Sequence, residues 1–142
     1  MTLSLRAYRL LLLLILTCVG SGALPSFAQA EDESFEPTVV AKNLLREAIE
    51  GVADKEVMVN RVSFPPHTEL PWHWHPGEEI FYVIEGVVTL KRRDQPDQSV
   101  SAGGAQKIAP EVIHTGLTGE EGAELVIFRV HTSGLPERYL AE

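Results

Sequence analysis

The chain has 142 residues, of which 12 are basic and 20 acidic, and it carries a formal net charge of −8. This length suits one domain with one hydrophobic core. The acidic balance argues against nucleic acid and anionic membrane surfaces as partners, because both are negatively charged.

The N-terminus has the residue order of a secretory signal peptide. Arg6 and Arg9 precede an apolar run, and small and polar residues follow up to Ala30. The apolar run is shorter than the roughly 20 residues that a membrane-spanning helix needs. We therefore expect residues 1–30 to be removed on export to the periplasm or the medium, with no stable membrane insertion afterwards. Cleavage after Ala28 is a near equal alternative.

Export has consequences for the mature chain. Cys18 is the only cysteine, so the mature chain would have no disulfide. A lipoprotein anchored through Cys18 is the weaker alternative, because no small residue stands directly before it. The mature chain would keep ten basic and twenty acidic residues, a net charge of −10. Its first segment, residues 31–37, is acidic and predicts a short mobile leader.

Residues 38–142 show the pattern of a single all-β domain. Short runs rich in valine, isoleucine and aromatic residues alternate with glycine, proline, aspartate and asparagine. Many short strands with regular turns are typical of an antiparallel sandwich or barrel. Residues 43–52 also fit a helical turn, although a strand is preferred there. The expected strands are 38–45, 56–64, 69–75, 79–84, 86–92, 98–101, 105–109, 113–118 and 123–131.

The segment "PWHWHPGEE" places two histidines on one face of a strand. Side chains alternate along a strand, so His73 and His75 point one way while Trp72 and Trp74 point the other. Two imidazoles in this arrangement can share a metal ion. The Pro76-Gly77 pair then bends the chain, which allows the next strand to return a carboxylate toward the same centre.

Two further residues are candidate ligands. Glu78 and Glu79 face opposite ways on their strand, so only one of them can be a ligand, and Glu79 shares its face with Phe81. His114 reaches the same centre only if the sheet curls over. Three nitrogen donors and one carboxylate suit a first-row transition metal.

Residues outside the ligand set have structural interpretations. Trp72 and Trp74 face away from the ligands and need cover, either from residues 38–50 or from a second subunit, and a homodimer is the preferred alternative. His67 is expected in a solvated loop. His131 is expected at the surface near the end of the last strand.

Two motifs resemble the signatures of the cupin superfamily. "HWHPGEEIFYVIEG" is similar to the first signature through His73, His75, Glu79 and Gly86. The resemblance covers roughly residues 38–131.

"GGAQKIAPEVIH" is similar to the second signature through Gly103 and His114. It departs from that signature at Ala109, where a proline is usual, and at Glu111, where a glycine is usual. We expect the turn at Glu111 to have a different shape from the family's, since a non-glycine residue at positive φ costs about 1 kcal/mol.

The resemblance implies an antiparallel β-barrel, or double-stranded β-helix, of two sheets with a divalent metal inside. Iron, manganese, nickel, copper and zinc are the candidates, and the implied ligands are His73, His75, Glu79 and His114. Two open positions would then accept water, dioxygen or a small bidentate molecule.

The resulting functional hypothesis is an exported single-domain cupin that acts on a small oxygenated organic molecule as a dioxygenase, isomerase, decarboxylase or lyase. The alternative is a non-catalytic metal-dependent module that binds or senses a small ligand. The motifs contain no obvious acid or base, and Glu111 and Tyr82 are the only candidates. Fold alone does not decide between these hypotheses.

Overall fold

The computed structural model describes residues 38–142, so the expected signal peptide and acidic leader lie outside the described residues. No helix in this part of the chain is long and apolar enough to cross a membrane. All of its regular elements are strands, as expected. They are β1 (Val40–Ala48), β2 (Lys55–Phe64), β3 (His73–Trp74), β4 (Glu78–Arg92), β5 (Gln98–Ser101), β6 (Ala105–Ile108), β7 (His114–Thr132) and β8 (Tyr139–Leu140).

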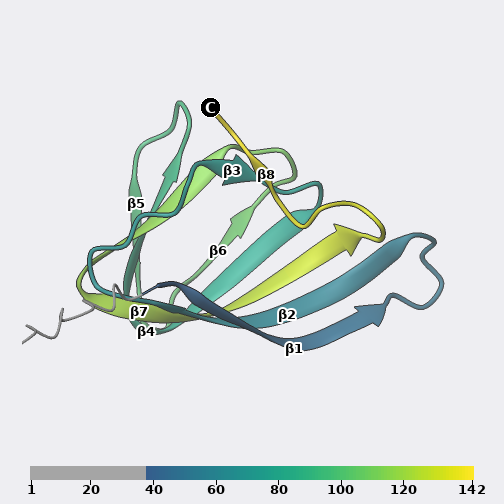
Figure 1. The fold of residues 1–142 in the computed structure, drawn as a ribbon, viewed down its shortest axis with the longest axis horizontal. Helices are drawn as coiled ribbons and strands as arrows, with labels where there is room; N and C mark the ends of the chain where they lie inside the picture. The colour runs from purple at the N-terminus through teal and green to yellow at the C-terminus, as the bar shows by residue number, and fades with distance from the viewer. Residues whose placement is uncertain (1–37) are drawn as a thin grey trace, which may run out of the picture. The chain divides into compact units, whose positions relative to one another are not determined.

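The strands form one curled antiparallel sheet (Figure 1). The long strands β4 and β7 pair along most of their length and connect its parts. Strand β7 also pairs with β2 and β3, while β5 and β6 extend the sheet from β4. This half-barrel confirms the expected antiparallel all-β fold. Strand β1 pairs with β2 throughout, which confirms a strand rather than a helical turn at the start of the domain.

Two glycines allow β4 and β7 to bend without ending. Four shorter strands were expected where the structure has these two long ones. Gly86 in β4 and Gly122 in β7 both have positive φ, at 76° and 69°, a conformation that glycine adopts without steric cost. A Cβ atom at Gly86 would lie 2.2 Å from the carbonyl oxygen of Gly122, so the two bends also pack against each other. The glycines therefore curl the sheet rather than interrupt it.

The core lies on the concave side of the sheet and follows the alternation of the strands. Inward positions of β4 are buried while their neighbours remain exposed, as in the run from Glu79 to Ile84. The largest group of buried apolar side chains is Val62, Phe64, Phe81, Val83, Val88, Leu90, Val100, Ile108, Ala123, Leu125 and Ile127.

The C-terminal segment supplies cover that the sequence did not reveal. Strand β8 pairs with β3, and the ring of Tyr139 stacks on Trp74 with centroids 4.3 Å apart. The amide of Ala141 donates to the carbonyl of Trp72. The prediction that residues 38–50 or a second subunit cover the tryptophans is therefore wrong for Trp74, because residues 139–141 of the same chain do so.

Two local expectations are also corrected. His131 is buried, at 1% exposure, and its Nε2 lies 3.0 Å from the carbonyl oxygen of Leu135, so the expected surface position is wrong. Glu111 has a φ of 63°, so the chain adopts there the left-handed conformation expected of a glycine. Its amide donates to the carbonyl of His75 over 2.9 Å, which holds the turn in place. The expected change of turn shape is therefore wrong.

Replacing Gly77 with alanine is expected to destabilise the domain by about 3 kcal/mol or more, at the upper end of overpacking effects. A Cβ atom there would lie 1.8 Å from the carbonyl oxygen of Val130, which is backbone and cannot rotate away. Urea unfolding of the metal-free protein measures the effect. Gly119→Ala is the matched control, because nothing lies within 4 Å of its added Cβ atom. Equal stability of the two variants would contradict the close approach.

Candidate metal centre

Three histidines from two strands and the following turn meet on the concave side of the sheet. His73 of β3 is the direct cross-strand partner of His114 of β7, and His75 follows two residues later on the same side. One ring nitrogen from each lies within 4.8 Å of the others. All three side chains are buried. The curl of the sheet therefore brings His114 to the pair, as the metal hypothesis required.

Backbone carbonyls orient all three rings. Nδ1 lies 2.7 Å from the Pro71 oxygen in His73, 2.5 Å from the Glu137 oxygen in His75 and 2.8 Å from the Val112 oxygen in His114. A carbonyl only accepts, so each Nδ1 carries the proton and each Nε2 presents a lone pair.

The Nε2 atoms of His75 and His114 are buried and have no hydrogen-bond partner in the described part of the chain. Orphaned lone pairs of this kind are costly unless a ligand occupies them. Carbonyls that accept from one ring nitrogen, and so leave the other free as a lone pair, are also typical of histidines that bind metal. The three histidines therefore fit a divalent metal ion.

Glu79 adjoins the histidines but also binds an arginine. Its Oε2 accepts from Arg129, 2.6 Å away, and lies 3.0 Å from Nε2 of His75. Its Oε1 lies 3.9 Å from Nε2 of His114. Strand register explains this contact, because Glu79 and Arg129 are cross-strand partners on β4 and β7. Oε1 is thus the atom that faces the site, and Glu79 as fourth ligand stays a prediction.

The pKa values place these groups in the protonation states that bind metal. Burial lowers the pKa of His73 to about 4, and burial also lowers the pKa of His114. Burial alone would raise the pKa of Glu79, but the charge of Arg129 lowers it well below its usual range. Neutral His73 and His114 and an ionised carboxylate are therefore present at neutral pH, as metal binding requires.

The stability of the metal-free protein is expected to fall as the pH drops from about 6.5 to about 4. The pKa of His73 is about 4 in the folded state and about 6.5 when unfolded, so the unfolded state takes up the proton first. The contribution of His73 to the free energy of unfolding is complete above this pH window and is lost below it. Urea midpoints between pH 7.5 and 4 measure the loss. If the urea midpoint of His73→Gln falls with pH as steeply as that of the wild type, protonation of His73 is not the cause of the loss.

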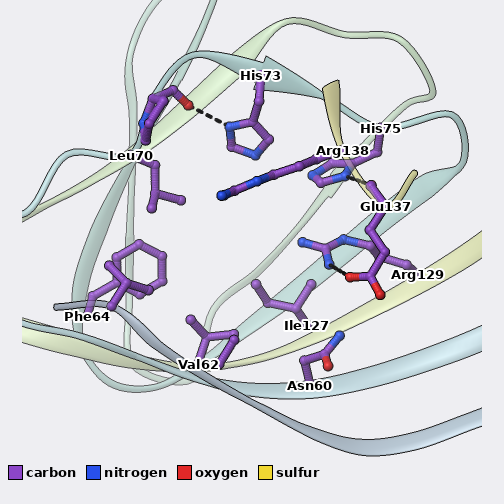
Figure 2. A pocket seen from close by; sticks show the side chains of 13 residues that line it. Asn60, Val62, Phe64, Leu70, His73, His75, Ile127, Arg129, Glu137 and Arg138 are labelled. Atoms are coloured by element: carbon purple, nitrogen blue, oxygen red, sulfur yellow. Dashed lines mark hydrogen bonds and ion pairs between the residues drawn. The ribbon is translucent and has the colours of Figure 1, made fainter. Parts of the chain in front are cut away.

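A cavity of about 490 Å³ lies beside the histidines (Figure 2). His73 and His75 form part of its wall, together with four polar residues that the sequence analysis did not propose: Asn60, Arg129, Glu137 and Arg138. The sequence could have indicated an inward position for Arg129, because Arg129 has the same strand parity as Ile127, which is buried. The full lining is Val39, Ala41, Asn60, Val62, Phe64, Leu70, Pro71, His73, His75, Ile127, Arg129, Glu137 and Arg138.

Several candidates lie away from the cavity. Glu78 contacts Lys107 over 2.8 Å on the outside of the sheet, which agrees with the choice of Glu79 by parity. Tyr82 and Glu111, the two possible acid or base residues, are exposed and do not line the cavity. His67 is exposed in its loop, as expected. No acid or base role is supported for any of these residues.

The comparisons with known proteins agree with this fold. A family model for the cupin domain matches residues 60–129, which include all four expected ligands. This chain belongs to the cupin superfamily. A search of curated proteins found no match.

Solved structures share the fold. A cupin-like protein from Thermotoga maritima is 26% identical, with a TM-score of 0.59 over 72% of this chain and 75% of that one. The DMSP lyase DddQ from Ruegeria pomeroyi is 18% identical, with a TM-score of 0.60 over 72% of this chain and 51% of the lyase. KdgF from Halomonas is 18% identical, with a TM-score of 0.55 over 69% and 84% of the two chains. At these identities, the last two comparisons show the fold alone.

Proposed function

We propose that this protein is an exported metal-dependent enzyme that acts on a small oxygenated organic molecule. The observation that carries the proposal is that two of the three clustered histidines, His73 and His75, lie in the wall of a cavity. Structural metal sites are closed by protein ligands, whereas catalytic sites keep positions open to substrate. A metal ion held by His73, His75 and His114 would therefore keep a coordination position open toward the cavity.

Some residues of the site would bind the metal, and others orient its ligands. The three histidines hold the ion, with Oε1 of Glu79 as the fourth donor. When bound, such a metal polarises an oxygen of the substrate, activates water or takes part in redox chemistry. Arg129 keeps Glu79 ionised and fixes its orientation.

The reaction class is dioxygenase, isomerase, decarboxylase or lyase. Structures of this fold include a DMSP lyase and an oxalate oxidase, so the fold accommodates both kinds of chemistry.

The second candidate is a non-catalytic module that binds or senses a small ligand. It is favoured by the ion pairs that bind the carboxylates near the cavity to arginines. Arg129 binds Glu79, and Arg46 binds Glu137 over 3.1 Å. Among the described residues that line the cavity, no carboxylate without a cationic partner is present to take a proton from a substrate.

Metal analysis of protein purified without an affinity tag, followed by oxygen uptake and turnover of small acids, distinguishes the two candidates. Activity that rises in proportion to iron, manganese or nickel content supports the enzyme. Tightly bound zinc with no turnover supports the binding module. His73→Ala should lose both metal and activity, whereas His67→Ala, in an exposed loop, should lose neither.

Export to the periplasm or the medium is part of the proposal and rests on the sequence of residues 1–30. The mass of the protein recovered from the periplasmic fraction tests it. Cleavage after Ala28 or Ala30 is the expected result. A full-length chain in the cytoplasm would contradict export.

We also propose a homodimer formed by the outer face of β4 and β7. Apolar side chains gather there, and all are more than a third exposed: Ile80, Tyr82, Ile84, Phe128 and Val130. Exposed apolar side chains in one patch are typical of subunit interfaces. Sedimentation of the wild type and of Tyr82→Lys tests this state. A wild-type monomer at micromolar concentration would contradict the dimer.

A further inference from the structure

The lining of the cavity leaves one positive charge without a partner. Glu79 neutralises Arg129, and Glu137 is bound by Arg46. Arg138 lines the same cavity, but no hydrogen bond or ion pair joins it to another residue of the described domain. Figure 2 shows its side chain extending into the cavity beside His73. The cavity therefore presents one unneutralised guanidinium, in a chain whose net charge is −8.

An arginine at the surface is ordinarily satisfied by water, so Arg138 alone would not indicate a ligand. A second observation comes from Asn60, which is 7% exposed and lines the same cavity. Its side-chain oxygen accepts from Nδ2 of Asn43 over 3.2 Å, which fixes the orientation of the Asn60 amide. Its own Nδ2 is buried and without a partner in the described domain.

An unsatisfied buried donor costs free energy that an acceptor on a ligand would recover. Arg138 offers donors only, and the atom of Asn60 that lacks a partner, Nδ2, is also a donor. The group of a ligand that best satisfies these donors is negatively charged and has several hydrogen-bond acceptors.

The rest of the wall is apolar. It is formed by Val62, Phe64, Leu70 and Ile127, and Figure 2 shows Asn60 beside Val62 and Ile127, on the other side of the cavity from Arg138. A cavity of about 490 Å³ is within the range of small-molecule sites. Its ligand should thus combine an anionic end with a short hydrocarbon part. Arginine binds carboxylates through its planar pair of N–H donors, which adds orientation to charge.

We propose that the ligand of this cavity is a small organic carboxylate, with its carboxylate bound by Arg138, another of its oxygens bound by Nδ2 of Asn60, and its hydrocarbon part against the apolar wall. This inference deepens the proposed function and rests on it for the role of the metal. Arg138 is the residue that sets the preference for an anion. The C-terminal segment therefore has two roles at the site, because the carbonyl of Glu137 orients His75 and the next side chain selects the ligand.

The test uses 4-methyl-2-oxopentanoate and its uncharged methyl ester as probes, with affinities measured by titration calorimetry on the full-length mature protein. The carboxylate should bind at least roughly tenfold more tightly than the ester. Arg138→Gln should remove most of that preference, while Arg138→Lys should keep part of it because the charge remains. Lys42→Gln is the control of equal charge, because Lys42 is exposed on β1 and does not line the cavity.

The outcomes separate this inference from the proposed function. Metal content should be unchanged in Arg138→Gln, because Arg138 is not among the metal ligands. A preference for the carboxylate that persists in metal-free protein and depends on Arg138 supports the inference even if no metal binds. Equal preference in the wild type and Arg138→Gln, no binding of the carboxylate, or tighter Arg138-dependent binding of inorganic phosphate would each overturn it.

Discussion

The His114→Ala variant is expected to lose metal affinity by at least roughly 100-fold, since even residues that only support a ligand contribute 10- to 100-fold. His114 brings β7 into the site, and its Nε2 has no hydrogen-bond partner in the described domain. Removing it leaves two nitrogen donors on one short segment. Competition with a coloured chelator measures the affinity of the purified variant.

The control for this substitution is His67→Ala, which removes an exposed histidine. It should bind metal as the wild type does. Circular dichroism at the same pH checks that both variants keep the sheet. Unchanged affinity in His114→Ala would remove His114 from the ligand set and would refute a centre built across β3 and β7.

Replacing Arg129 with methionine is expected to destabilise the metal-free protein by about 3–5 kcal/mol, the usual cost of leaving a buried charge without its partner. Glu79 is 7% exposed and would remain as an uncompensated carboxylate. Bound metal should reduce the loss, because a cation beside Oε1 of Glu79 replaces part of the missing charge. Urea unfolding with and without metal measures both effects.

The double variant Arg129→Met with Glu79→Gln should recover more than half of the loss, since no buried charge remains. Arg61→Ala serves as the surface control. Arg61 also pairs with a glutamate across strands, but its side chain is 53% exposed, so its loss should cost under about 1 kcal/mol. Equal effects of Arg61→Ala and Arg129→Met would contradict a buried role for the Glu79 contact.

Strand parity and one motif predicted much of the fold and of the site. The alternation of "HWH" placed His73 and His75 on one face, and parity separated Glu79 from Glu78. Both inferences depend on residues close together in the chain, where the two-residue period of a strand holds. The position of His114 followed from the resemblance to the family and not from spacing.

The remaining features depend on contacts between distant segments. Arg129 lies opposite Glu79 because of the register of β4 with β7, which parity alone does not fix. The C-terminal strand was missed because it has two residues and no periodic pattern to detect, yet it covers Trp74 and brings Arg138 to the cavity. The expected strands were interrupted before residue 86 and between residues 118 and 123, although the positive φ values of Gly86 and Gly122 let each strand bend and continue.

A crystal structure of the metal-loaded protein, with anomalous diffraction at the absorption edge of the bound metal, tests the central claim most directly. The expected result is one ion bound by Nε2 of His73, His75 and His114, with Oε1 of Glu79 as fourth donor and an open position toward the cavity. An ion bound elsewhere, or through Nδ1 atoms, would contradict the proposed centre.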